Sequence, residues 1–139
     1  RIILSLLQGQ AGCPRINSGF VDVRDLADLH LLAMTHPAAK GERFLAIAGE
    51  SMWMTDVAKV LRDNLGEVGR KVSTRELPNW MVRLAARSNP NMKSMAPLLE
   101  VNMNCTSEKA RRLLGWSPRS REEAIVATAR SLVSLGLVG

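Results

Sequence analysis

Three aspartates and a histidine lie close together near the start of the chain, and they are its first candidates for chemistry. Asp22, Asp25 and Asp28 are spaced three residues apart, and His30 follows them. On a helix, Asp25 and Asp28 share one face, with Arg24 close by. Such a group could handle a proton or hold a metal ion. The favoured interpretation is structural, because Asp25 can cap a helix at the positive end of its dipole and an aspartate can pair with Arg24.

The other motifs expected for catalysis or cofactor binding are missing from the sequence. Neither a dinucleotide-binding G-x-G-x-x-G nor a phosphate-binding G-x-x-x-x-G-K-[ST] occurs, and there is no G-x-S-x-G for a nucleophile. His30 and His36 are six residues apart, whereas two metal-binding histidines on one helix are separated by four. Cys13 and Cys105 share no motif, so we expect two free thiols in a reducing cytoplasm. We therefore expect this chain to hold no catalytic residue, no cofactor and no metal.

The charge and hydropathy of the sequence limit its partners. The formal net charge is +6, which raises the possibility of nucleic-acid binding. The basic residues are mixed with acidic ones, as in residues 59–71, and aromatic side chains that could stack on bases are scarce. No apolar run approaches the roughly 18 residues of a membrane span, and the apolar start of the chain is too short for a signal peptide. We expect a cytoplasmic protein that binds neither nucleic acid nor membranes.

Apolar periodicity and end signals predict a series of helices. Thr55 and Thr106 are the expected N-caps of two of them, and Gly66 and Gly115 are the expected terminators. Residues 120–123 form an S-x-x-E capping box that opens the last helix. The predicted helices cover residues 2–9, 25–34, 55–65, 77–85, 92–99, 106–114 and 120–135.

Extended segments are few by comparison. Residues 20–23, 43–48 and 72–74 are predicted strands, and 43–48 carries the strongest pattern. Three short strands cannot easily form a sheet of their own, so we expect them to complete a sheet supplied by other residues. The helix at 25–34 is apolar nearly all round, which predicts burial on most of its faces. Trp116, just after the glycine that ends a helix, is expected to pack back on that helix.

Three segments resemble, in this order and spacing, the C-terminal part of a known family. Residues 21–27 (VDVRDLA) look like V-[DH]-V-x-D-[LV]-A, and residues 41–46 (GERFLA) are similar to the strand that follows it. Residues 107–118 (SEKARRLLGWSP) look like S-x-K-A-x-x-x-L-G-[WF]-x-P. The family is the extended short-chain dehydrogenases/reductases, or NAD-dependent epimerases/dehydratases, and the resemblance covers about residues 17–138. None of the three segments is catalytic in that family.

This resemblance implies an α/β fold in which residues 1–139 are the mostly helical, C-terminal substrate-binding lobe of a Rossmann-type enzyme. The dinucleotide-binding half of the family, with its glycine-rich loop and its Ser/Thr–Tyr–Lys catalytic set, is absent from this chain. The sequence contains no tyrosine, in agreement with that reading. By resemblance, the parent protein is an enzyme that uses NADP or NAD to transfer a hydride. The chain alone is expected to bind no cofactor and to be inactive.

The resemblance also indicates a branch of the family. Sugar-nucleotide members carry an arginine just before the aromatic residue that corresponds to Phe20, where this chain has Ser18 and Gly19. They often carry an R-x-G-D-type segment as well, and residues 75–80 (RELPNW) offer no such set of charges. The chain is therefore more similar to the dihydroflavonol reductase and aldehyde reductase branch, whose members reduce uncharged ketones or aldehydes in an apolar cleft. Residues 77–84 suit such a cleft, and Ser18 and Phe20 are the predicted substrate-binding residues.

Two other functions remain open at this point. The family resemblance also permits a sugar-nucleotide epimerase or dehydratase. The missing tyrosine and glycine-rich loop, together with the charge of +6, permit a non-enzymatic interaction module. If the chain is one lobe of a larger enzyme, the surface that the other half covers is exposed and apolar, which predicts self-association of the isolated chain.

Overall fold

The computed structural model describes residues 2–138, and most of them are helical. Two 3₁₀-helices, η1 (Pro37–Ala39) and η2 (Ala96–Leu98), accompany the α-helices. The α-helices are α1 (Ile2–Leu7), α2 (Val23–Thr35), α3 (Met54–Asn64), α4 (Gly66–Arg70), α5 (Asn79–Ala85), α6 (Pro90–Met95), α7 (Glu108–Leu114) and α8 (Arg121–Ser134). Each helix that the sequence predicts is present, within a few residues at its ends.

The strands of the described chain are two residues long and form two separate pairs. Strand β1 (Cys13–Pro14) pairs in parallel with β4 (Glu76–Leu77). Strand β2 (Asn17–Ser18) pairs antiparallel with β3 (Met52–Trp53), which places Asn17 opposite Trp53 and Ser18 opposite Met52. The expectation of a mostly helical α/β chain with a few short strands is therefore confirmed.

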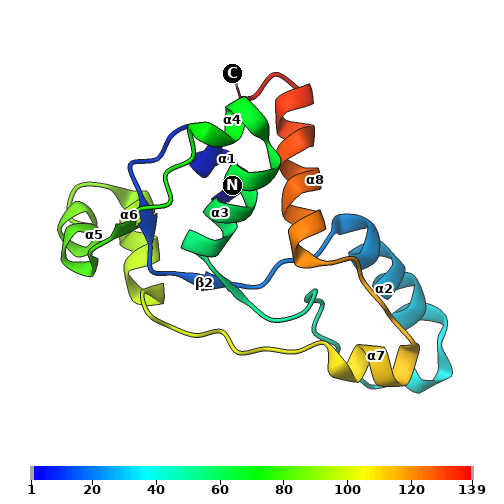
Figure 1. Ribbon diagram of the computed structural model, residues 1–139. Coiled ribbons are helices and arrows are strands. Elements are labelled where there is room, and N and C mark those ends of the chain that lie inside the picture. Colours follow the sequence, from blue (N-terminus) through cyan, green and yellow to red (C-terminus); the bar gives the residue numbers. More distant parts are fainter. Residues whose placement is uncertain (1, 139) are drawn as a thin grey trace.

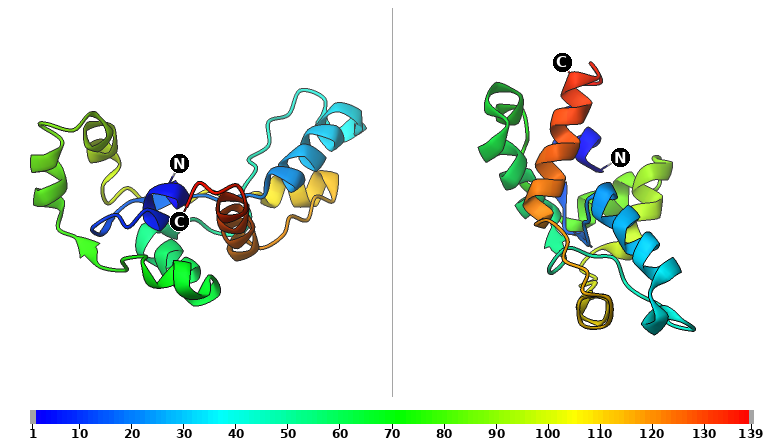
Figure 2. Two further views of the ribbon diagram at one scale, coloured as in Figure 1. Left: turned by 90° about the horizontal axis from the view of Figure 1, so that it is seen from above. Right: turned by 90° about the vertical axis from the view of Figure 1, so that its right-hand side faces the viewer.

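The helices divide the molecule into a centre and two ends. Helices α3 and α8 pack together in the centre with α1, while α2 and α7 lie together at one end and α5 and α6 at the other (Figure 1). Seen from above, both ends bend toward the same side, so the chain forms an open V with the two termini near its base (Figure 2).

Each part of the molecule has its own small core. The central core contains Leu6 of α1, Leu61 of α3 and Ile125 of α8, all less than 2% exposed. At the α2–α7 end, the buried residues are Leu29, Ala39, Ala110, Leu114 and Trp116. At the α5–α6 end, the buried residues are Ile16, Val82 and Leu99. Trp116 thus packs on the helix that precedes it, as the sequence predicts.

The predicted strands are wrong in position. Residues 20–23 form the entry to α2, and residues 72–74 come before β4, so pairing occurs a few residues away in both cases. Residues 43–48 join no strand pair of the described chain, and their single backbone hydrogen bond runs from the N–H of Ala48 to the carbonyl of Phe20 at 2.8 Å. A strand forms only where a neighbouring backbone accepts and donates along its length, and the apolar pattern of 43–48 cannot supply that neighbour.

Helix α2 also differs from its prediction. Its N-cap is Asp22 rather than Asp25, and the helix begins two residues earlier than expected. Leu29 is buried, but Val23, Leu31 and Met34 are 74%, 61% and 81% exposed. The predicted burial on most faces is therefore wrong for this chain, and α2 presents an apolar face to solvent.

The ends of the other helices follow local rules in most cases. Gly115 ends α7 with φ at 65°, and the capping box between Ser120 and Glu123 opens α8. The N-cap of α7 is Ser107 rather than the predicted Thr106, although the Thr106 hydroxyl accepts a hydrogen bond from the backbone N–H of Glu108 at 3.2 Å. The predicted cap by Thr55 is wrong, because α3 begins at Met54 with no side-chain cap.

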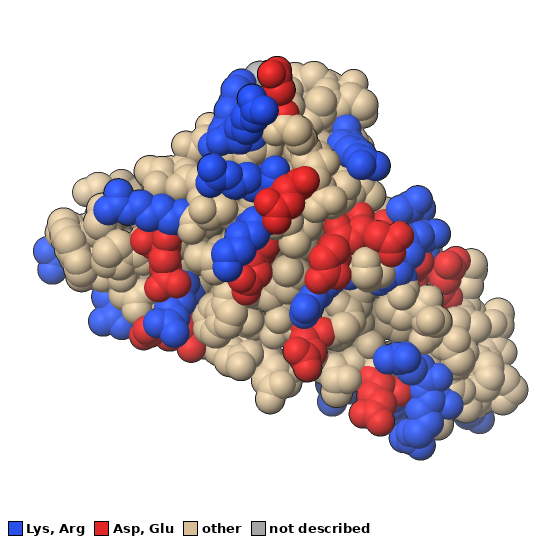
Figure 3. All heavy atoms as spheres, viewed as in Figure 1, with Lys and Arg blue, Asp and Glu red and all other residues tan. Residues whose placement is uncertain are grey.

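Among the described helices, none is long and apolar enough to cross a membrane. Residues 2–138 contain no group of three or more histidine, cysteine, aspartate or glutamate side chains that could hold a metal ion. On the face shown in Figure 3, basic side chains lie among acidic ones, as expected for solvated helix surfaces.

Candidate functional site

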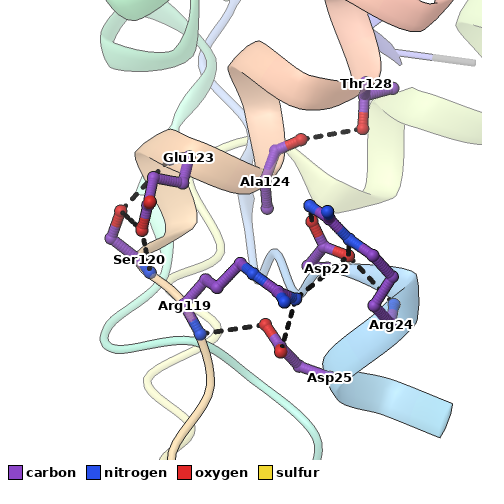
Figure 4. Close-up of polar contacts among 8 residues, drawn as sticks. All are labelled: Asp22, Arg24, Asp25, Arg119, Ser120, Glu123, Ala124 and Thr128. Carbon is purple, nitrogen blue, oxygen red and sulfur yellow. Dashed lines mark hydrogen bonds and ion pairs between the residues drawn. The ribbon is translucent and has the colours of Figure 1, made fainter.

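The aspartates of the first motif form ionic contacts at the start of α2 (Figure 4). Asp22 is only 6% exposed and caps the helix by accepting the backbone N–H of Arg24 at 2.9 Å. The guanidinium of Arg24 folds back on the same carboxylate, with Nε at 2.9 Å and Nη2 at 2.7 Å. One aspartate therefore satisfies both the backbone and the side chain of a residue two positions later.

Asp25 joins α2 to the segment between α7 and α8, more than ninety residues away in sequence (Figure 4). Arg119 donates its backbone N–H to Oδ2 at 2.9 Å and its Nη1 to Oδ1 at 2.7 Å. The carbonyl of Asp25 accepts the indole N–H of Trp116 at 2.8 Å. The first and third of the three motifs that carry the family resemblance thus meet in space, through Asp25 and Trp116.

The electrostatics of this cluster oppose a role in proton transfer. The hydrogen bonds from Arg24 hold the pKa of Asp22 well below its usual range, and the same pair raises the pKa of Arg24. A carboxylate that stays ionised and is already bound on both oxygens cannot act as a general base near neutral pH. Asp28 and His30, the other members of the sequence pattern, lie on the exposed side of α2.

Sequence reasoning found the residues of this cluster but not all of their partners. It predicted a cap and an arginine–aspartate pair, and both exist. It assigned the cap to Asp25, whereas Asp22 is the cap and Asp25 is bound by Arg119. Arg119 lies immediately after the W-x-P end of the third motif, but nothing local in the sequence marks it as a partner of α2. The geometry of the cluster is that of a structural joint.

The predicted substrate-binding residues lie near each other but have different surroundings. Ser18 is in β2, opposite Met52, and is partly exposed. Phe20 is partly buried and packs against the central core. Neither residue lines the two adjoining cavities, of about 840 and 420 Å³, that lie near β3. Their role as substrate contacts therefore stays a prediction.

The apolar segment predicted for a substrate cleft forms α5 and lies at one end of the V. Val82 is buried against Ile16 and Leu99, while Trp80 on the same helix is 66% exposed. Met92 and Met95 of α6 pack against this small core. Helix α5 therefore has one face in the core and another, with an aromatic residue, open to solvent.

Comparison with known proteins identifies the fold. No family model and no curated protein matches the sequence. Among solved structures, the chain is similar to gox2253 with a TM-score of 0.75 and 20% identity, over 99% of this chain and 44% of that one. It is also similar to Gre2 from Candida albicans, with a TM-score of 0.69 and 24% identity, over 97% and 36% of the two chains.

A third similar structure is the yeast methylglyoxal/isovaleraldehyde reductase Gre2 complexed with NADPH. The TM-score is 0.70 and the identity 22%, over 98% of this chain and 40% of that one. The chain spans less than half the length of each of these three proteins. It has the fold of the C-terminal, mostly helical part of extended short-chain dehydrogenases/reductases.

Proposed function

We propose that this chain is the C-terminal, substrate-binding part of an NADPH-dependent reductase that acts on a small ketone or aldehyde. The observation that carries the proposal is the likeness, over 98% of this chain, to a reductase of methylglyoxal and isovaleraldehyde complexed with NADPH. The three motifs of the sequence support the same family. The dihydroflavonol reductase and aldehyde reductase branch is the part of the family whose uncharged substrates suit the apolar residues of α5.

The proposal divides the chemistry between two parts of one enzyme. The nicotinamide cofactor supplies the hydride, and the general acid of this family is a tyrosine, which this chain lacks. Both must come from a dinucleotide-binding part outside these residues. This chain then contributes substrate contacts, with Ser18 and Phe20 as the proposed residues. The isolated chain turns over no carbonyl substrate.

The exposed surface supports the existence of a second part. The apolar face of α2, formed by Val23, Leu31 and Met34, has the composition of a surface that another body covers. Leu45 is 58% exposed in the extended segment 43–48, whose backbone is almost unpaired in the described chain. A dinucleotide-binding part whose sheet accepts this segment as a further strand would cover both features at once.

The experiment that tests this proposal compares two proteins. One is the 139-residue chain, and the other is the product of the reading frame extended upstream. Each is incubated with NADPH and either methylglyoxal or isovaleraldehyde, and NADPH oxidation is followed by absorbance. The extended protein should consume NADPH, and substitution of Ser18 by a bulky leucine should raise KM more than it lowers kcat. An extended protein that turns over neither aldehyde, or a Ser18→Leu variant with an unchanged KM, would contradict the corresponding part of the proposal.

The two free thiols, Cys13 and Cys105, also fit the proposed setting. Unpaired cysteines persist where glutathione keeps thiols reduced, so we propose a cytoplasmic location for the enzyme.

A further inference from the structure

Two adjoining cavities are lined mainly by three separate stretches of the chain: the link into β3, the stretch before α7 and the link between α7 and α8. The larger has a volume of about 840 Å³ and the smaller about 420 Å³. Glu50, Asn104, Cys105 and Arg121 line both, so the two cavities adjoin. These sizes fall in the range of about 300–1,000 Å³ that is typical of small-molecule sites.

The larger cavity is lined by a largely buried serine whose hydroxyl the fold does not use. Ser107 is only 5% exposed and occupies the N-cap position of α7. A serine there normally accepts a hydrogen bond from the first turn of its helix, but this one makes no such bond. The neighbouring Thr106 serves the N–H of Glu108 instead. Among the described residues the Ser107 hydroxyl has no partner, and its side chain lines the cavity.

The smaller cavity is lined by a second largely buried residue with an unpartnered polar atom, Asn17. Asn17 is 5% exposed, and its Oδ1 accepts the backbone N–H of Met103 at 3.1 Å. That bond fixes the orientation of the amide, because only the oxygen can accept. The amide nitrogen is left without a partner within residues 2–138, and Asn17 lines the cavity. Both residues are largely buried, but their unpartnered polar atoms remain accessible from the adjoining cavities, so a polar occupant can hydrogen-bond to both.

The charges around the cavities favour a neutral occupant. Of the arginines in the larger cavity, Arg119 is bound to Asp25 and Arg121 to Glu122. Arg111 has no ion pair within the described chain, but the carboxylates of Glu50 and Glu108 line the same cavity. The arginine charge that remains unpaired is thus offset by carboxylates, which disfavours a phosphate or another anion. An apolar molecule would displace water from the polar atoms of Ser107 and Asn17 without replacing its hydrogen bonds.

We propose that the two cavities together bind a neutral polyhydroxylated molecule, a sugar or a polyol. Each hydroxyl of such a molecule both donates and accepts, which matches a lining that mixes donors, acceptors and hydroxyls. Ser107 and Asn17 bind it from the buried side. Arg111, Glu50 and Glu108 bind it from the rim.

Cys105 provides a probe at the junction of the two cavities. Its thiol is free and partly exposed, whereas Cys13 is buried. The rate of alkylation of each cysteine by iodoacetamide can be followed by mass spectrometry of the peptides. Maltose and sorbitol serve as neutral probes, glucose 6-phosphate and sodium phosphate as anionic ones, and polyethylene glycol as a control for viscosity.

Maltose or sorbitol should slow the alkylation of Cys105 in a saturable manner. Loss of one hydrogen bond in Ser107→Ala should raise the concentration for half-protection about fivefold. Ser134→Ala, which changes an exposed serine at the end of α8, should leave it unchanged. Should Ser107→Ala fail to fold, Arg111→Gln is the second variant. Arg111 is exposed at the rim of the same site, and its substitution should also raise the concentration for half-protection.

Several outcomes would overturn the proposal. One is the absence of protection by either neutral probe up to its solubility limit. Another is protection by the phosphate-bearing probes alone, which would show that the site is anionic. Equal slowing by polyethylene glycol, or equal protection in wild type, Ser107→Ala and Arg111→Gln, would show that the effect is not binding at this site.

Discussion

At the scale of single residues, the aspartates of the first motif show how one pattern can serve two structural tasks. Asp22 fixes the start of α2, and Asp25 fixes α2 to the α7–α8 link through Arg119. Both carboxylates are buried and both are fully bonded, so their charge is part of the fold. Substitution of either aspartate should therefore lower the free energy of unfolding.

The first prediction concerns pH. The pKa of Asp22 lies below its usual range in the folded chain, so the folded state favours the ionised form. Asp22 therefore contributes stability at every pH above its unfolded pKa of about 3.9, and this contribution falls as the pH drops below that value. Asp22→Asn keeps a good N-cap but removes the charge.

Urea denaturation of both proteins, followed by circular dichroism from pH 7 to pH 2.5, tests this prediction. The variant should be less stable at pH 7, and the difference should narrow below about pH 4. A difference that stays constant over the whole range would show that the charge of Asp22 is not what stabilises the fold.

The second prediction concerns Asp25. Asp25→Ala removes both hydrogen bonds from Arg119 and should lower the free energy of unfolding by about 1.5–3 kcal/mol, the range for bonds to charged groups. Partial exposure of Arg119 places the value toward the lower end. Asp28→Ala, on the exposed side of the same helix, is the matched control and should change it by less than about 0.5 kcal/mol. Equal effects of the two substitutions would contradict the assignment of Asp25 as a joint.

At the scale of the elements, helices could be predicted from the sequence because their signals are local. The capping box at Ser120 and Glu123 and the glycine at 115 define the ends of α8 and α7 from a few neighbouring residues. Strand pairing depends on residues far away, so residues 43–48 carry a strand pattern without a described strand beside them. The same limit concealed Arg119, the partner of Asp25, and the cavities where three distant stretches meet.

The third prediction tests one such local signal. Gly115 has φ at 65°, and a Cβ added there would meet nothing within 4 Å. Gly115→Ala should therefore cost about 1–2 kcal/mol through backbone conformation alone. Gly115→Asn should cost less, because asparagine adopts this conformation more readily than alanine. Thermal unfolding of the three proteins provides the comparison, and an alanine variant as stable as wild type would contradict the glycine's role as terminator.

At the scale of the whole molecule, the open V and the apolar face of α2 agree with the proposal that this chain is one part of a larger enzyme (Figure 2). The helix prediction anticipated burial of this face, and the described chain leaves it uncovered. The apolar pattern of α2 is consistent with the environment of the proposed complete enzyme. Under that proposal, the prediction from sequence and the structure of the isolated chain disagree because the part that covers α2 lies outside these residues.

The fourth prediction follows from that exposed face. The isolated chain should self-associate and bind a dye specific for apolar surface. The double variant Leu31→Lys, Met34→Lys should reduce both effects without lowering the thermal midpoint, because both side chains are exposed. Light scattering and dye fluorescence measure the two effects. A wild-type chain that is monomeric and binds no dye would show that the apolar face of α2 does not require a second part of the protein to bury it.

The most direct test of the central claim is NADPH binding, measured by fluorescence titration, for this chain and for the protein extended upstream. The account predicts no saturable binding by the 139 residues alone, and tight binding with turnover of an aldehyde by the extended protein. Saturable NADPH binding by the isolated chain, or an extended protein without a dinucleotide site, would contradict it.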